Sequence, residues 1–372
     1  MEPNFPKQWL EHDAKVKPYV WNHRILSWSD SLLKLGLFLV LFLSWELERW
    51  SSIIESQTQN LWWQWVIFFG FLAFLSEALS LPFSIGHQVI EKRFHLSKQS
   101  WKSWWIDRMK SWLLGAVLGI LALAIIFISV QFFLRWWFLA ASLLILFSII
   151  LAQLTPVILI PIFFELEPMQ EGELKDRLFK LCERFRVMVK DIYHLGLGEK
   201  TEKGNAAFVG IGRTKKIIIG DTLYKKFPPE QVEAVFAHEL GHQVHNDLWK
   251  GILTSSLGLY LAFYLTNEAC ARWVWTSFQT SAQLPYGIFL FFIILSVIQI
   301  PFGIFQNTYT RHCERRADSF AHEKIGSGKE LANALEKLTV QNFSYFCPHS
   351  LVEFLTYTHP APWRRISYLR KY

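Results

Sequence analysis

Two histidines lie four residues apart in the stretch His238-Glu239-Leu240-Gly241-His242, and a glutamate follows the first of them. Apolar residues recur at helical spacing before this stretch, and residues four apart on a helix share one face. Both imidazoles can therefore bind one metal ion, and Glu239 can accept a proton from a water molecule at that ion. The spacing predicts His238 and His242 as ligands of one Zn²⁺ ion and Glu239 as a general base.

A third protein ligand must come from elsewhere, because catalytic zinc typically has three protein ligands and a water molecule. One class of zinc peptidases has a glycine and then a histidine at fixed spacings after the second histidine. His245 and Leu248 occupy those positions here, which excludes that class. A carboxylate is the other solution, and Glu314 and Asp318 share one helical face. Glu314 is predicted as the third ligand, while Asp318 either accepts a hydrogen bond from the outer nitrogen of a ligand histidine or donates a proton in catalysis.

Two other titratable side chains are alternatives to be weighed. His245 follows His242 by about one helical turn, but it lies about 10.5 Å from His238 along the helix axis. Two ligand nitrogens on one zinc ion lie within about 3.5 Å of each other, so this geometry favours Glu314. Glu77 ends a predicted membrane span, where a carboxylate is a functional candidate by default, although it can equally form an ion pair near the interface.

Long uncharged stretches surround these candidate residues. Of the 372 residues, 52% are hydrophobic and only 19% are charged, which excludes a disordered chain or a coiled coil. A helix needs about 20 apolar residues to cross the hydrocarbon core of a membrane. Six spans are predicted, at 31–45, 56–76, 111–134, 136–164, 251–267 and 273–310, of which the first and fifth are the shortest.

These spans divide the chain into two predicted regions. Residues 1–163 form an N-terminal membrane region with four spans, and residues 164–372 form a zinc peptidase domain interrupted by spans at about 251–268 and 284–306. Residues 174–190 predict an amphipathic helix, and 206–209 with 216–219 predict a β-hairpin. The expected fold class is mostly α, a polytopic α-helical membrane protein whose peptidase domain contains a small β-hairpin.

Basic residues are unevenly distributed among the connecting segments. The connection between the second and third predicted spans is rich in Lys and Arg, whereas the next connection contains only Arg135. By the positive-inside rule, both termini and the predicted zinc site are expected on the cytoplasmic side. The net charge of +7 agrees with this topology and with attraction to a lipid bilayer. No basic stripe with pairing aromatics indicates a nucleic acid partner.

Several further motifs accompany the two predicted ligand segments. They are Leu81-Pro82-Phe83-Ser84, Val89-Ile90-Glu91-Lys92, Asn205-Ala206, Gly210, Asp221-Thr222-Leu223 and His359-Pro360 with Arg365. Together they resemble the CAAX prenyl protease family of integral-membrane zinc metalloendopeptidases, from about residue 60 to the C-terminus. The resemblance implies that Asn205 hydrogen-bonds the substrate backbone beside an edge strand. It also implies that His359 and Arg365 lie over the scissile carbonyl and the substrate chain. The family's larger members have seven spans, one more than predicted here.

The expected function is that of a zinc-dependent membrane metalloendopeptidase acting on peptides or membrane-associated proteins. The resemblance implies that it trims the C-terminal residues of prenylated proteins. One alternative is a quality-control protease for membrane proteins without prenyl selectivity. Another is a non-catalytic scaffold that binds zinc for structure, which Glu239 disfavours because a structural zinc site needs no base. The expected location is a bacterial plasma membrane or an endoplasmic reticulum, as an integral multi-pass protein.

Overall fold

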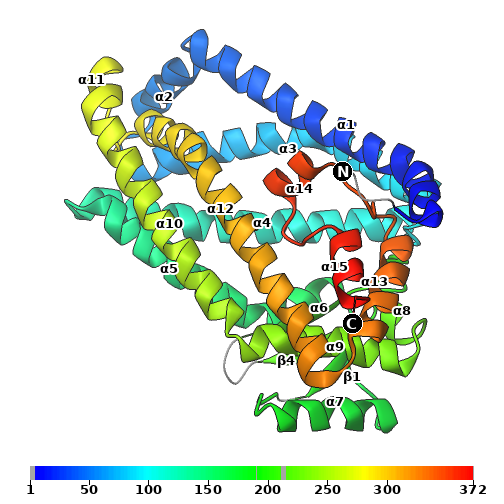
Figure 1. Ribbon diagram of the computed structural model, residues 1–372. Helices are drawn as coiled ribbons and strands as arrows, with labels where there is room; N and C mark the ends of the chain where they lie inside the picture. Colours follow the sequence, from blue (N-terminus) through cyan, green and yellow to red (C-terminus); the bar gives the residue numbers. More distant parts are fainter. Residues whose placement is uncertain (1–4, 190, 211–214, 372) are drawn as a thin grey trace.

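The computed structural model describes residues 5–189, 191–210 and 215–371 and is mostly helical, as predicted (Figure 1). The first part contains α1 (Lys7–Leu43), α2 (Glu46–Gln57), α3 (Leu61–Arg93), α4 (Trp101–Phe132), α5 (Trp136–Leu154), the π-helical turn η1 (Thr155–Leu159) and α6 (Ile160–Phe163). There follow β1 (Leu166–Pro168), α7 (Glu173–Arg184), β2 (Ile192–Leu195), β3 (Ala206–Val209), β4 (Lys216–Gly220), α8 (Asp221–Tyr224) and α9 (Pro229–Val244). The remainder contains α10 (Asp247–Ala269), η3 (Cys270–Val274), α11 (Trp275–Ser277), α12 (Pro285–Ile325), α13 (Gly328–Gln341), α14 (Ser350–Thr356) and α15 (Pro362–Leu369).

Five helical segments of the described chain are long and apolar enough to cross a membrane. They are α1, α3, α4, α12 and the stretch Trp136–Phe163, which comprises α5, η1 and α6. The fifth predicted span is α10, a helix of 23 residues that packs against both α5 and α12. α10 is less apolar than the five because charged and amide side chains occupy both of its ends (Asp247, Lys250, Asn267 and Glu268).

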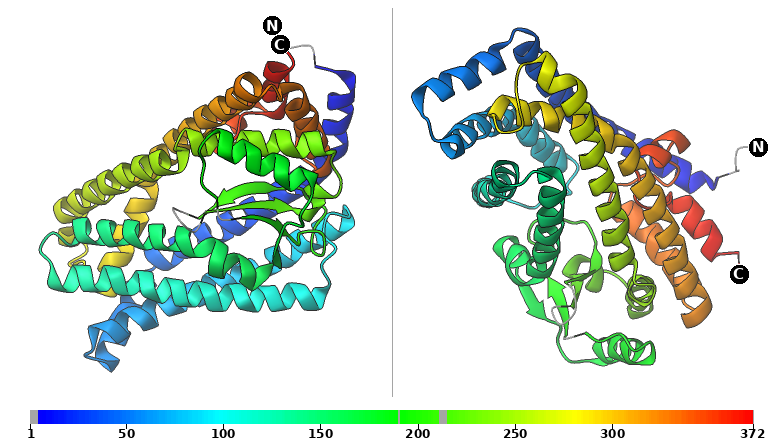
Figure 2. Two further views of the ribbon diagram at one scale, coloured as in Figure 1. Left: turned by 90° about the horizontal axis from the view of Figure 1, so that it is seen from below. Right: turned by 90° about the vertical axis from the view of Figure 1, so that its left-hand side faces the viewer.

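α1 begins well before the predicted span at 31–45. Its first turns bury Trp9, Val16 and Tyr19, which recur on one helical face. Trp9 stacks on Phe346, with ring centroids 5.1 Å apart, and donates a hydrogen bond to Glu336. The polar N-terminal segment is therefore helical because it packs against the C-terminal part of the chain, as Figure 2 shows.

The sheet contains four strands in the order β1-β2-β4-β3. The predicted hairpin is confirmed, since β3 pairs antiparallel with β4 and Ala206 lies opposite Ile219. β2 pairs parallel with β4, and β1 pairs antiparallel with β2, which adds two short strands that were not predicted. β3 lies at one edge of the sheet, and no strand of the described residues pairs with its outer side, which could therefore accept another strand.

The two histidines lie on a helix as predicted: α9 begins at Pro229 and packs against α7, α12, α13 and β3. Its buried residues Val232, Phe236 and Leu240 join the apolar core between these elements. The predicted helix at 174–190 is shorter, because Arg186 adopts a positive φ of 54° that ends α7. Lys190, the last residue of that prediction, lies outside the described residues.

Gly241 permits a close approach between α9 and α12. A Cβ atom at this position would lie 3.0 Å from the Cα atom of Ala317 and 3.2 Å from the Cβ atom of Phe320. Carbon atoms normally pack at about 3.5–4.0 Å, so any larger residue would push the helices apart. The absence of a side chain at Gly241 therefore places the segment 314–318 of α12 beside the histidines of α9.

Candidate metal centre

The structure brings the three predicted ligands together. The Nε2 atom of His238 lies 3.3 Å from Oε2 of Glu314, and Nε2 of His242 lies 3.3 Å from Oε1 of the same carboxylate. The two imidazole ring centroids are 4.9 Å apart and the rings are nearly perpendicular. One ligand atom from each of the three residues lies within 4.8 Å of the other two. They form a three-donor cluster of two imidazoles and one carboxylate.

This cluster fits a zinc ion. Two ligand atoms at about 2.0–2.1 Å from a tetrahedral zinc ion lie about 3.4 Å apart, close to the observed separations. Glu314 is only 4% exposed, and its Oε2 atom has no hydrogen-bond partner among the described residues. A buried carboxylate oxygen without a hydrogen bond costs free energy, which a bound cation would offset. Two histidines and one glutamate are also an established ligand set for catalytic zinc.

Each ligand histidine has a second carboxylate partner through its other ring nitrogen. Nδ1 of His238 lies 2.9 Å from Asp318, and Nδ1 of His242 lies 2.9 Å from Asp247. When Nδ1 donates to a carboxylate, the Nε2 lone pair is left free to bind a metal. The contact between Asp318 and a ligand histidine was predicted, whereas Asp247 was missed. Its position five residues after His242, at the start of the next helix, is the only signal in the sequence.

Arg365 lies behind this cluster. Its guanidinium donates two hydrogen bonds to Asp318, of 2.8 and 2.7 Å, and approaches Oε2 of Glu314 at 3.4 Å. The side chain is 9% exposed. Arg316 likewise binds Asp247. The two arginines therefore compensate part of the negative charge that the carboxylates concentrate here.

The surroundings change the proton affinities of residues on α9. Burial raises the pKa of Glu239, which favours its uptake of a proton near neutral pH. Burial opposes the charged form of His242, but Asp247 and Glu314 outweigh it and raise the pKa to about 10. Burial and Arg365 likewise oppose a charge on His238, yet Asp318 and Glu314 raise its pKa. Because zinc binds neutral imidazole, a metal at this cluster would displace these protons.

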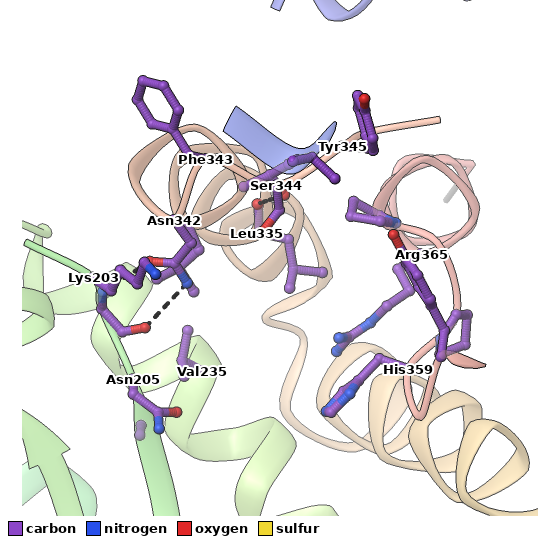
Figure 3. Close-up of a pocket in the computed structure, with 18 of the residues that line it drawn as sticks. Lys203, Asn205, Val235, Leu335, Asn342, Phe343, Ser344, Tyr345, His359 and Arg365 are labelled. Carbon is purple, nitrogen blue, oxygen red and sulfur yellow. Dashed lines mark hydrogen bonds between the residues drawn. The ribbon is translucent and has the colours of Figure 1, made fainter. Parts of the chain in front are cut away.

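A cavity of about 760 Å³ opens onto the cluster, a volume within the range of about 300–1,000 Å³ that is typical of ligand pockets (Figure 3). His238 and Glu239 line it, and Figure 3 shows His359 and Arg365 across the cavity from Asn205. His359 has a side chain that is 59% exposed, and its Nε2 atom lies 3.2 Å from Glu314. The structure thus brings Glu239, His359 and Arg365 to the cluster, whereas Asn205 lies across the cavity.

The edge strand near Asn205 is held by a distant residue. The side chain of Asn342 accepts a hydrogen bond of 2.9 Å from the Gly204 N–H and donates one of 3.2 Å to the Gly204 carbonyl (Figure 3). A Cβ atom at Gly204 would lie 2.8 Å from a methyl group of Leu338, so the backbone sits tightly against α13. Sequence reasoning missed Asn342, and no local pattern signals it.

The two alternative candidates lie outside this cluster. Nδ1 of His245 donates a hydrogen bond of 2.7 Å to the carbonyl of Gly241, so this ring packs against its own helix. Glu77 accepts hydrogen bonds from Arg108 and Trp112, at 2.8 and 2.9 Å, and so links α3 to α4. His245 ends a helix, and Glu77 joins two helices.

The sequence matches two known family patterns. Residues 168–372 match peptidase family M48, and residues 14–165 match the pattern described as the CAAX prenyl protease N-terminal region with five membrane helices. Four spans were predicted in the N-terminal region, where the structure has the five helices α1 to α5. Four segments of this region, α1, α3, α4 and Trp136–Phe163, are long and apolar enough to cross a membrane, whereas α2 has only 12 residues.

Individual relatives agree with the family match. The chain is 27% identical over 345 residues to the uncharacterized metalloprotease YhfN of Bacillus subtilis, across 90% of this chain and 80% of that protein. It is 26% identical over 347 residues to the probable CAAX prenyl protease 1 of Schizosaccharomyces pombe, across 92% and 69%. The crystal structure of S. mikatae Ste24p shares its fold, with a TM-score of 0.87 and 24% identity over 97% of this chain and 89% of that one. Because the family M48 match spans more than half of the residues, this chain belongs to peptidase family M48 and is an integral membrane metalloprotease.

Proposed function

We propose that this metalloprotease is a zinc endopeptidase of the HExxH type, in which His238, His242 and Glu314 bind one Zn²⁺ ion. The observation that carries the proposal is the cluster of three donors within 4.8 Å, with Glu239 beside it in the same cavity. A zinc ion bound there would polarise the scissile carbonyl and lower the pKa of water toward about 7.

Glu239 is the general base in this proposal. It lines the cavity beside His238, and its raised pKa brings it closer to the pH at which a base works best. Glu239 accepts the proton of the attacking water and delivers it to the leaving amine. His359, which is exposed to the cavity next to Glu314, donates a hydrogen bond to the oxyanion that forms on the carbonyl.

Asp318 orients a ligand in this proposal and does not donate a proton. It is 1% exposed, and its two oxygens accept hydrogen bonds from Arg365, while one of them also lies 2.9 Å from His238. No O–H group is left to act as an acid, so Asp318 fixes the tautomer of His238. Arg365 holds Asp318 in place and presents its remaining edge to the substrate in the cavity.

The substrate peptide binds as an added strand. β3 is an edge strand, and the cavity is lined by Gly204, Asn205 and Ala206 at its start. An extended peptide can pair with such an edge through main-chain hydrogen bonds. The exposed side chain of Asn205 then hydrogen-bonds the peptide backbone and sets its register.

The relatives guide the choice of substrate class. Those named CAAX prenyl protease 1, from Schizosaccharomyces pombe and Saccharomyces cerevisiae among others, favour C-terminal segments of prenylated, membrane-associated proteins. Quality control of membrane proteins without prenyl selectivity is the second candidate function.

The basic connections favour an active site on the cytoplasmic side, with residues 1–163 as membrane region and 164–372 as peptidase domain.

Peptide cleavage by the purified full-length chain tests this function. The zinc-loaded protein should cleave a farnesylated C-terminal peptide, a chelator should abolish cleavage, and added zinc should restore it. Glu239→Gln should keep one zinc ion per chain but lose at least about 10²-fold in rate, because the amide accepts no proton. Glu233→Gln, on the same helix but outside the cavity lining, is the matched control and should cleave normally.

Three outcomes decide between the alternatives. Full activity of Glu239→Gln with bound zinc would contradict the role of the base. Equal cleavage of the farnesylated and unmodified peptides would favour the quality-control function. Stoichiometric zinc without hydrolysis of any peptide would favour a scaffold.

A further inference from the structure

The cavity extends from the metal centre to a wall formed by α1. That wall contains an arginine and two aromatic residues among its members (Tyr19, Val20, His23, Arg24, Ser27 and Trp28). Opposite lie α13 and the segment that follows it, including Tyr345, which Figure 3 shows on the far side of the cavity from Asn205. Val235 and Leu335 lie between these two ends and make the middle of the cavity apolar.

Among the lysine and arginine side chains that line the cavity in the described part of the chain, Arg24 is the one without a carboxylate partner. Lys203 lies 2.8 Å from Glu91, and Arg365 binds Asp318. No carboxylate of the described residues forms an ion pair with Arg24. Its guanidinium instead lies close to the hydroxyl of Tyr357, another residue of the cavity wall.

Three carboxylates of the surrounding segments are engaged elsewhere. Asp13 accepts hydrogen bonds of 2.7 and 2.9 Å from the backbone N–H groups of Phe346 and Cys347. Glu91 accepts from Lys203 and from the Tyr19 hydroxyl. Glu353 accepts from Arg364 and from a backbone N–H group. The positive charge of Arg24 therefore remains available to an anion inside the cavity.

We propose that Arg24 binds the free C-terminal carboxylate of the substrate, which makes this chain selective for peptide bonds near a C-terminus. The inference rests on the proposed peptidase function. A peptide that pairs with β3 and passes Glu239 enters a cavity of only about 760 Å³. A short apolar segment can cross Val235 and Leu335, and its terminal carboxylate then meets the planar guanidinium, which binds two carboxylate oxygens at once.

The proposal predicts a difference between two peptides that share a sequence. A peptide with a free C-terminal acid should bind about tenfold or more tightly than the same peptide with a C-terminal amide, because hydrogen bonds between charged partners are stronger than neutral ones. A chain without such a subsite treats the two peptides alike.

Binding to the full-length, zinc-loaded Glu239→Gln variant measures this ratio without cleavage. Fluorescence anisotropy in a non-ionic detergent free of phospholipid gives the Kd of each labelled peptide, so that no lipid phosphate competes. Adding Arg24→Gln should bring the ratio of the amide Kd to the acid Kd close to one, and Arg24→Lys should retain part of it. Lys17→Gln removes the same charge from an exposed position of α1 outside the cavity lining and should leave the ratio unchanged.

Two results would overturn the proposal: equal binding of acid and amide by the protein with Arg24 intact, or a ratio that survives Arg24→Gln. The first comparison requires no change at Arg24, so misfolding of that variant does not leave the question open. If the ratio behaves as expected but the chain with Glu239 intact hydrolyses no peptide, the proposed peptidase function fails while the carboxylate subsite stands.

Discussion

Glu314 approaches both histidines from a second helix, whereas His245 bonds to the helix on which it lies. We therefore expect Glu314→Ala to lower zinc occupancy and abolish activity, because it removes the only carboxylate within ligand distance among the described donors. His245→Ala should leave both properties nearly intact. Metal analysis of the two purified variants, with peptide cleavage measured in parallel, checks this prediction. Loss of zinc from the His245 variant alone would show that the proposed ligand set is wrong.

Asp247 gives a second prediction, since it fixes the ring of His242 through Nδ1. Asp247→Ala should weaken zinc binding by about 10–100-fold, the usual effect of removing a hydrogen-bond partner of a metal ligand. Asp247→Asn should recover part of this loss, because its amide oxygen still accepts the Nδ1 hydrogen. Competition with a chelator measures the affinity, and exposed Asp176→Ala on α7 is the control. Unchanged affinity in Asp247→Ala would mean that His242 is held by other contacts.

At the scale of helices, the contact between α9 and α12 depends on one missing side chain. Gly241→Ala should destabilise the protein by about 1–3 kcal/mol, because its methyl group would meet Ala317 at 3.0 Å. The shift of α12 should also move Glu314 away from the histidines and lower zinc affinity. Gly251→Ala on α10 is the matched control, since its nearest neighbour is 4.0 Å away. Thermal unfolding with and without zinc separates the two effects, and equal melting temperatures would contradict the argument.

The elements that were predicted correctly are those with a local signal. α9 starts at a proline, and its two histidines lie about one helical turn apart. The sequence was therefore sufficient to predict this helix and the two ligands on it. The contribution of Asp247 depends on Asn246, whose positive φ of 55° turns the chain back toward His242. Asn is more common in this conformation than most residues, but a single Asn does not predict it. The contact between Asn342 and Gly204 joins residues far apart in the chain, which only the folded structure brings together.

Strand length explains the incomplete prediction of the sheet. β4 contains three consecutive isoleucines, so the hairpin with β3 was visible. β1 has three residues and β2 has four, too few for an alternating pattern to stand out. The parallel pairing of β2 with β4 also joins strands that are separated in the chain by turns and by β3, and these give no register. The site residues on helices were therefore easier to predict than the strand that we propose for the substrate.

At the scale of the whole molecule, the connections form two groups. In one group, the connection after α1 meets the connection before α12, where Trp45 packs against Phe278 with ring centroids 5.9 Å apart. In the other group, the connection after α3 meets the segment before β3, where Ser97 forms a β-bridge with Thr201. We expect single cysteines near Gln57 and Gln279 to react with an impermeant reagent from outside, and those at exposed positions near Gln99 and Gly204 to be protected. The basic connections provide the reason, because they remain on the cytoplasmic side. The native cysteines are replaced first, and labelling of an exposed position near Gly204 in intact cells would invert the proposed orientation.

The unbroken course of α12 has a consequence for how this chain can vary. Its 41 residues extend about 60 Å at 1.5 Å per residue, twice the thickness of about 30 Å of a hydrocarbon core. The same helix thus crosses the membrane and carries Glu314 and Asp318. One residue inserted between the apolar half and these carboxylates would rotate both by about 100° and turn them away from α9. The direction in which Glu314 and Asp318 point around the axis of α12 is therefore fixed by the number of residues in its membrane-spanning part. A change in that number requires a compensating change in the position of the two carboxylates.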